Sequence, residues 1–400
     1  MDKGKNWLYY PNFAKTWKRQ TLYSLANWVN GIAFRDIHFS PVGKPVIKIA
    51  EVKNGVSEQT KFTEQIFGES VHVRHGDIIF SWSGQPETSI DVFRWQGSSG
   101  WLNQHLFRVT PKFEVDETFF FYLLRYLKPN FVGIARNKQT TGLGHVTRRD
   151  LEGISIAYPP LPEQRAIAEV LGALDDKIEG NRSVIEKSES FATTCIETSE
   201  CMVRLGDIAS IEKSTLSPQN FASQIVDHFS IPAYDARRVP IRELGQNVKS
   251  SKHQLHGTRV LISKLNPHIS RVWYAATEPH VLAIASTEFI CFKSVSGSNP
   301  EELWASCKSR QFSEQLQERV TGTTGSHQRV RPEDILSISI NDPRELSEAS
   351  RLTVQDAIQL VNTLQTENLK LADLRDTLLP KLLSGEIQVR EVAERVGEVV

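Results

Sequence analysis

Two stretches of the sequence concentrate cationic and amide side chains that could bind a nucleic acid. They span residues 136–149 and 319–331. Arginine and lysine anchor phosphates, while asparagine, glutamine and arginine can hydrogen-bond to base edges in the major groove. The residues expected to make these contacts are Arg136, Asn137, Lys138, Gln139, Thr140, Thr141, His145, Arg148, Arg149, Thr323, Thr324, Ser326, His327, Gln328, Arg329 and Arg331. The alternative is that Thr-Thr-Gly in each stretch is only a turn before a strand.

A second candidate surface lies in the later half of the chain. Its members are Lys249, Lys252, Lys264, Asn266 and Arg271. The matching positions of the earlier half, Ser81 and Trp82, are far less basic. We expect both groups to contact nucleic acid, although a charged loop is often only a solvated face of a protein.

The charge of the chain is balanced overall but uneven along its length. The 47 basic and 47 acidic residues argue against a uniformly basic nucleic-acid-binding protein. Residues 236–271, however, hold eight Lys or Arg against one acid, Glu243, whereas residues 161–200 are rich in Glu and Asp. Basic surface is thus segregated into particular segments, as a local phosphate-binding face requires.

Motifs of the common nucleic-acid enzymes are absent. Residues 158–161 read Tyr-Pro-Pro-Leu, which has the two prolines of an adenine-methyltransferase loop but neither flank, and suits the entry to a helix better. No Gly-x-x-x-x-Gly-Lys-Ser/Thr phosphate loop is present. His72 with His75, and His253 with His256, have no neighbouring Cys or acidic cluster to complete a metal site. We therefore expect no catalytic residue, no metal and no cofactor.

The sequence repeats itself at an offset of 181 to 184 residues. Three pairs of segments carry the repeat: 75–81 with 256–263, 140–145 with 323–327, and 149–156 with 333–340. Matches in the same order at a near-constant offset indicate two copies of one fold.

Each copy ends in a long segment with the period of a coiled coil. The first begins at Glu163, after a proline-rich stop, and extends to about Glu200; the second ends near Pro380 and Gly385. Seam residues recur at spacings of about three and four: Ile167, Leu171, Leu174, Ile178, Asn181 and Ile185 in the first, and Ala357, Val361, Leu364, Asn368, Leu371 and Leu378 in the second. The simplest partner for each seam is the other copy, which gives an antiparallel pair with a pseudo-two-fold axis. The alternative is that each helix packs on its own domain.

These patterns predict an α+β chain in which two globular mixed α/β domains alternate with two long helices that form an antiparallel coiled coil. The expected segments are 1–158, 159–200, 201–342 and 343–400. No apolar run reaches the roughly 18 residues of a membrane span, and the N-terminus does not read as a secretory signal. The cysteines form no Cys-x-x-Cys pair. We expect a cytoplasmic protein without membrane contact.

Several of these segments resemble one known family. Residues 159–182, from Pro-Pro-Leu-Pro-Glu-Gln-Arg to Leu-Asp-Asp-Lys-Ile-Glu and Asn-Arg, resemble the central spacer of specificity subunits of type I restriction-modification systems. Residues 374–387 resemble the end of their C-terminal spacer. Residues 30–34 with 43–49 resemble the opening of one of their target-recognition domains. The resemblance covers nearly the whole chain.

The resemblance implies two target-recognition domains that each read one half of a split double-stranded DNA target. Two methyltransferase subunits would dock around the spacer helices and endonuclease-translocase subunits would join the complex, so the chemistry would belong to these partners. Two non-identical halves imply an asymmetric target, because identical halves would read a symmetric one. The second half lacks a counterpart of residues 30–34, which indicates a different recognition subtype.

Three other functions are weighed against this one. A solitary DNA-binding regulator could share the architecture. A coiled-coil adaptor that binds only protein would not need the basic segments. A salt-dependent affinity for DNA would distinguish a specificity subunit from such an adaptor. A self-contained nuclease or methyltransferase would need a catalytic motif, and the sequence shows none.

Overall fold

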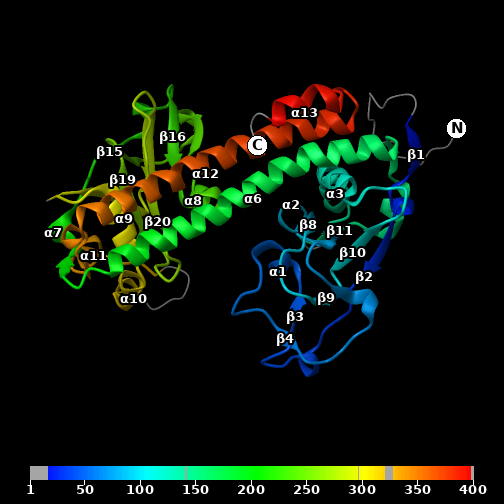
Figure 1. Ribbon diagram of the computed structural model, residues 1–400, viewed down its shortest axis with the longest axis horizontal. Coiled ribbons are helices and arrows are strands. Elements are labelled where there is room, and N and C mark those ends of the chain that lie inside the picture. The colour runs from blue at the N-terminus through cyan, green and yellow to red at the C-terminus, as the bar shows by residue number, and fades with distance from the viewer. Residues whose placement is uncertain (1–16, 140–141, 296, 320–327, 398–400) are drawn as a thin grey trace. The chain divides into compact units, whose positions relative to one another are not determined.

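The computed structural model describes residues 17–139, 142–295, 297–319 and 328–397 (Figure 1). The chain divides into two compact units. The first unit comprises residues 1–176 and 373–400, and the second comprises residues 177–372. The boundary crosses both long helices, α6 (Leu161–Glu197) and α12 (Glu348–Leu383), so each unit contains part of each helix.

The main sheet has the same strand order in both units. The first unit has the order β2-β10-β6-β8 and the second has β14-β22-β19-β20, with every neighbouring pair antiparallel. The strands are β2 (Ala26–Asn30), β6 (Ile78–Ser81), β8 (Asp91–Arg94), β10 (Leu106–Pro111), β14 (Ala209–Ile211), β19 (Arg259–Ser263), β20 (Val272–Ala275) and β22 (Phe289–Ser294). The repeat predicted from the sequence is therefore present in the topology.

A second sheet is inserted into each unit, again with a shared order. It reads β4-β3-β9-β5 in the first unit and β17-β16-β21-β18-β15 in the second, where β15 is an added strand. One pair in each is parallel, β3 with β9 and β16 with β21. The strands are β3 (Lys44–Ile47), β4 (Phe62–Thr63), β5 (His72–Val73), β9 (Gly100–Leu102), β15 (Thr215–Leu216), β16 (Ile225–Phe229), β17 (Ile241–Leu244), β18 (Lys252–Gln254) and β21 (Leu282–Ser286).

Short strand pairs and helices complete the repeat. The pair β1 (Lys18–Thr21) with β12 (Ser155–Tyr158) matches β13 (Met202–Arg204) with β23 (Ser339–Asn341), and β7 (Ser83–Gly84) pairs with β11 (Gly144–His145). The corresponding helices are α3 (Glu117–Tyr126) and α9 (Pro300–Lys308), α4 (Lys128–Asn137) and α10 (Arg310–Glu318), and α5 (Arg148–Gly153) and α11 (Pro332–Leu336). The remaining helices are α1 (Ile49–Asn54), α2 (Pro86–Ser89), α7 (Leu205–Ile208), α8 (Ile231–Arg237) and α13 (Val389–Gly397).

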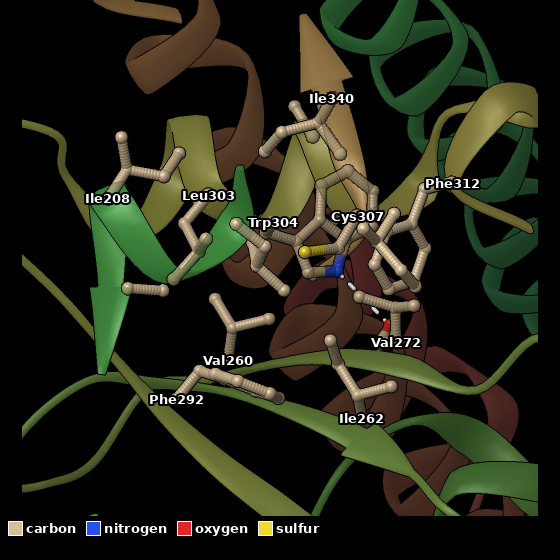
Figure 2. Packing of buried hydrophobic residues seen from close by; sticks show 14 of the residues in the cluster. Ile208, Val260, Ile262, Val272, Phe292, Leu303, Trp304, Cys307, Phe312 and Ile340 are labelled. Atoms are coloured by element: carbon tan, nitrogen blue, oxygen red, sulfur yellow. Dashed lines mark hydrogen bonds between the residues drawn. The ribbon is translucent and has the colours of Figure 1, made fainter. Parts of the chain in front are cut away.

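Each unit has its own apolar core. In the second unit, Val260 and Ile262 of the main sheet pack toward Leu303 and Trp304 of α9, as Figure 2 shows. The Trp304 indole Nε1 donates to the carbonyl oxygen of Val272 at 3.1 Å, which satisfies its polar atom inside the core. In the first unit, a cluster that includes Ile47, Ile79 and Trp101 joins the inserted sheet to the main sheet. These cores hold the strand ends that form the candidate site.

The six seam residues expected in α6 are all buried. In α12, Val361 and Leu371 are buried, but Ala357, Leu364, Asn368 and Leu378 are only half-buried. The buried face of α12 is rotated toward a second set of apolar residues: Val354, Ile358, Leu379 and Leu382. Polar residues, among them the buried Arg375, interrupt this face. The spacing of apolar residues in the sequence therefore predicts that a neighbouring stripe of the helix surface is buried instead.

Within the second unit, the two long helices contact each other through polar as well as apolar residues. The Asn181 Nδ2 donates to Asn368 Oδ1 at 3.0 Å and to Glu367 Oε2 at 2.9 Å. Further along, the Cys195 Sγ lies 4.0 Å from the carbonyl oxygen of Ser350. Since the contacts run in opposite order along the two helices, these segments are antiparallel.

In the part of the chain that the structure describes, no helix is both long enough and apolar enough to cross a membrane.

Candidate nucleic-acid interface

The two groups of residues expected to bind nucleic acid in the first half meet in the structure. The chain leaving β6 forms β7, which pairs with β11 so that Ser83 lies opposite His145. The Val146 amide donates to the carbonyl oxygen of Trp82 at 2.8 Å. We call residues 82–84 with 144–146 the first strand-end site.

The second unit builds the same arrangement. The Asn266 amide donates to the carbonyl oxygen of Gln328 at 2.9 Å, and the Val330 amide donates to that of Lys264 at 3.1 Å. Leu265 forms an isolated bridge with Arg329. We call residues 264–266 with 328–330 the second strand-end site. Both sites therefore join the end of the corresponding strand, β6 or β19, to a segment about 60 residues later.

Trp82 is the main aromatic side chain of the first strand-end site. Its indole is half-buried, and its Nε1 donates to Asn30 Oδ1 at 3.1 Å. Its ring lies 6.1 Å from that of His105 and 5.8 Å from that of Phe107, measured between centroids. Ser81 is different, because it is fully buried and its hydroxyl lies inside the fold. The expectation that Ser81 contacts nucleic acid is therefore not supported by its position.

A glycine positions the Asn30 side chain. The Gly31 amide donates to the carbonyl oxygen of Leu106 at 3.1 Å. A Cβ atom at Gly31 would lie 2.2 Å from the carbonyl oxygen of Asn103, so only glycine fits this approach of two backbones. The Asn30-Gly31 step of the recognition-domain opening thus has a structural role beside Trp82.

The cations Arg136, Lys138 and Arg148, which come from the chain segments next to the first strand-end site, are paired with acidic side chains. Arg136 Nη2 lies 2.6 Å from Glu87 Oε1, and both side chains are largely exposed. Exposed surface pairs of this kind contribute little to stability, so a phosphate can replace the carboxylate at low cost. The hydrogen bond from Arg136 holds the pKa of the Glu87 carboxyl below its usual value.

Lys138 and Arg148 are held more firmly. The Lys138 Nζ lies 2.6 Å from Asp150 Oδ1. Burial alone would raise the pKa of the Asp150 carboxyl, but hydrogen bonds from Lys138 and Thr147 outweigh it and keep that pKa low. Arg148 pairs with Glu152 at 2.7 Å, and its guanidinium lies 4.7 Å from the centroid of the Tyr23 ring.

The remaining residues of the first stretch occupy the surface around the site. Asn137, Gln139 and Arg149 are exposed, and His145 is half-buried in β11. The Gln139 Nε2 donates to the carbonyl oxygen of Gly142 at 2.7 Å. Thr140 and Thr141 lie outside the described residues.

The second strand-end site is more polar than the first. Lys264 and Gln328 are half-buried, while Arg329 and Arg331 are exposed. Arg329 Nη2 lies 3.0 Å from Glu288 Oε1, and this hydrogen bond raises the pKa of the guanidinium. Thr323, Thr324, Ser326 and His327 lie outside the described residues.

Asn266 is the most unusual residue of this site. Its φ of 49° places it in the left-handed region that asparagine tolerates better than most residues. Its Oδ1 is buried without a hydrogen-bond partner among the described residues. The equivalent position of the first site is Gly84, which also has a positive φ, of 134°.

Two of the expected basic contacts are buried instead. Lys252 is 7% exposed, and its Nζ donates to the Ser250 hydroxyl at 2.6 Å; burial lowers the pKa of its ammonium. Arg271 is 8% exposed and pairs with Asp235 at 2.6 Å. Neither side chain presents its charge to a ligand, because each is folded against its own unit. Lys249, by contrast, is exposed.

Four of the eight cations of the basic segment 236–271 pair with acids that lie outside it. The pairs are Arg238 with Glu189, Arg242 with Asp227, Arg259 with Glu212 and Arg271 with Asp235. A count along the sequence cannot detect partners that the fold brings from elsewhere. Sequence reasoning likewise missed Glu87, Glu288 and His105 beside the two sites, and no local signal marked them.

Comparisons with known proteins show what this chain is similar to. Residues 14–187 match the family model of the type I restriction modification DNA specificity domain. The chain is 28% identical over 175 residues to the type I restriction enzyme EcoBI specificity subunit of Escherichia coli, which is 43% of this chain and 35% of that protein. It is 29% identical over 135 residues to the MjaVIII specificity subunit of Methanocaldococcus jannaschii, which is 34% of this chain and 29% of that protein.

The sequence matches thus span about a third of the length of these relatives. The similarity of fold extends further. The crystal structure of a type I restriction-modification S subunit from M. genitalium superposes with a TM-score of 0.56 at 15% identity, covering 96% of this chain and 98% of that one. Residues 14–187 therefore match a type I restriction modification DNA specificity domain, and the chain is similar to the specificity subunits of type I restriction enzymes.

Proposed function

We propose that this chain reads a bipartite, asymmetric DNA target, with one half recognised by each unit. The observation that carries the proposal is the repeated strand-end site. The same backbone hydrogen bonds recur after β6 and after β19, yet the side chains differ, with Trp82 in one site and Lys264 in the other. Equivalent geometry with different side chains is what two different half-sites require.

The recognition domains would be residues 1–158 and 201–342. Residues 159–200 and 343–400 would act as spacers that form an antiparallel coiled coil and set the gap between half-sites. The buried α6 seam and the hydrogen bond between Asn181 and Asn368 support this role. Within the first unit, the ion pair of Arg375 with Asp175 supports it as well.

The partners would be those of the family. Double-stranded DNA, two methyltransferase subunits and, through the complex, endonuclease-translocase subunits would assemble on this chain in the cytoplasm. The chain itself would be non-catalytic and would use no cofactor or metal. Exposed cations such as Arg149 and Arg331 would supply phosphate contacts, which predicts a salt-dependent affinity.

The decisive experiment is co-expression of the chain with a cognate methyltransferase subunit, followed by mapping of methylated adenines across the host genome. We expect a split asymmetric motif that disappears when this chain is omitted. A complex that forms without any motif, or the absence of a complex, would contradict the proposal and favour a regulator or an adaptor.

A matched pair of variants assigns the half-sites. Trp82→Ala should relax or abolish one half of the mapped motif, and Lys264→Ala should affect only the other half. Lys112→Ala changes an exposed lysine that follows β10 at the end opposite the first strand-end site, and serves as the control. Effects of both variants on the same half-motif would contradict the assignment of one half to each unit.

A further inference from the structure

Trp82 is held in one orientation by three elements of the first unit. The Asn30 side chain accepts its indole N–H, the Val146 amide binds its carbonyl oxygen, and the rings of His105 and Phe107 lie beside it. A ring fixed in this way loses little conformational freedom when a ligand binds against it.

Beyond Trp82, aromatic rings continue across the strands of the main sheet, from β10 to β2. Phe107 lies 6.1 Å from Trp28, and Trp28 stacks on Tyr23 at 6.2 Å with an interplanar angle of 10°. Arg148 covers the Tyr23 ring at the far end. We call Trp82, Phe107, Trp28 and Tyr23 the aromatic row. It gives Trp82 a stiff apolar support and ends in a cation.

The second unit shows which of these rings the fold itself needs. By strand register, Trp28 corresponds to Ile211 and Phe107 corresponds to Ile290, so both positions remain apolar. Both rings are half-buried, and Trp28 packs edge-on against the buried Phe80, so apolar packing within the unit explains these two positions.

The position of Trp82 behaves differently. Its equivalent is Lys264, and the equivalent of His105 is Glu288, since the backbone hydrogen bond from Trp82 to His105 is repeated from Lys264 to Glu288. A position that accepts a half-buried lysine faces solvent and does not need an aromatic ring for folding. The indole of Trp82 therefore requires another explanation.

We propose that Trp82 stacks against a base that is displaced from the DNA helix within the half-site of the first unit. This inference rests on the proposed function and adds a mode of recognition to it. An indole matches the size and flatness of a base, and such stacking is tolerant of base identity. The nearby exposed Arg136 can anchor the adjoining phosphates, with the Glu87 carboxylate released. The second unit, with Lys264 in place of the indole, reads its half-site without displacing a base.

The test uses the full-length chain with its methyltransferase partner and duplexes that carry the mapped target. Trp82→Phe and Trp82→Leu form a matched pair: both remove the indole N–H and keep an apolar side chain on Phe107, but only Phe can stack. We expect Trp82→Leu to weaken binding on the order of 10-fold and Trp82→Phe by about threefold or less.

A second measurement detects the displaced base directly. An abasic residue is placed opposite each base of the first half-site in turn, on either strand, which removes pairing but keeps the base. At one position, wild-type affinity should rise on the order of 10-fold, because the cost of unpairing and unstacking falls. Trp82→Phe should keep this gain and Trp82→Leu should lose it. Positions opposite the methylated adenines are left out of the comparison, because the methyltransferase subunits extrude those bases themselves.

Equal affinities of the Phe and Leu variants, or the absence of any position where an abasic residue strengthens binding, would overturn the inference. If either of these results is obtained while the wild-type complex still methylates the mapped motif, only the stacking inference fails and the proposed function is retained. If the wild-type complex directs no methylation at all, the proposed function fails first. Thermal unfolding of both variants confirms that the comparison is made between folded proteins.

Discussion

The two units fasten their long helix to the sheet domain at the same place but with different chemistry. In the first unit, the Gln164 Nε2 donates to the carbonyl oxygen of Glu114. In the second, Arg351 Nη2 donates to the equivalent carbonyl oxygen of Gly297 and also pairs with Glu302, which is fully buried. A neutral amide and a charged pair thus fill the same structural role.

The same contrast recurs at the strand-end sites. Backbone hydrogen bonds are kept between the units, while Trp82 and His105 are exchanged for Lys264 and Glu288. The two units therefore share the backbone hydrogen bonds that determine the fold. Their side chains differ where they would face a ligand, or where more than one residue type can make the same attachment.

The largest expected effect tests whether the helices relate the two halves. Insertion of one heptad into α6 and a matching heptad into α12 lengthens each helix by about 10.5 Å. At ~3.4 Å per base pair, the gap in the methylated motif should grow by about three base pairs, with both half-motifs preserved. The genome-wide methylation map measures this change. An unchanged gap in a complex that still methylates would refute the spacer role.

The next effect sharpens the comparison of the two helix attachments. Arg351→Met leaves the buried Glu302 carboxylate without its cation and should lower the free energy of unfolding by about 3–5 kcal/mol. Gln164→Met removes neutral hydrogen bonds and should cost about 1–3 kcal/mol. Denaturant titration of the full chain measures both. Equal costs would mean that the charge of Arg351 contributes nothing particular to the second attachment.

A smaller effect is expected at the asparagine pair between the helices. Asn181→Leu leaves the Asn368 amide facing an apolar side chain and should destabilise the chain by about 1–3 kcal/mol. The double variant Asn181→Leu/Asn368→Leu should recover part of this loss, because the Asn368 amide no longer lacks its partner, although Glu367 still loses its donor. Unfolding of the single and double variants gives the coupling energy, and additive costs would show that the two asparagines do not interact.

The smallest effect concerns salt. Lys264→Ala should reduce the slope of log affinity against log salt concentration by about 0.9, as expected for one lost phosphate contact. Trp82→Leu should weaken binding without changing that slope, since stacking releases no counterion. Binding titrations at several salt concentrations distinguish the two. A reduced slope for Trp82→Leu would contradict this expectation, because it would mean that the substitution removes a phosphate contact.

Much of the architecture follows from the sequence because its signals are local. The repeat offset locates equivalent strands, and the apolar spacing of α6 identifies all six of its buried seam residues. In α12 the polar residues Asn368 and Arg375 lie on or beside the contact face, so the apolar period alone selects a neighbouring stripe. A helix whose interface is partly polar cannot be oriented by hydrophobicity.

The candidate sites were less predictable, because their electrostatics depend on distant partners. Arg271 reads as a free cation in the sequence, yet Asp235 neutralises it inside the fold. Arg136 reads the same way, but Glu87 from another helix faces it. The pairing of Trp82 with residue 146 is also invisible, since backbone contacts between segments about 60 residues apart leave no mark on composition.

The division of the chain also has a consequence for its synthesis on the ribosome. The second unit is one continuous segment, residues 177–372, whereas the first needs residues 373–400 to join residues 1–176. The first unit is therefore completed only after the second has been made. Asp175 meets Arg375, and the buried valines of α13, Val392 and Val396, join the first unit, only after residue 372 has been synthesised. A nascent chain that stalls after residue 372 would carry a finished second unit and an open first one.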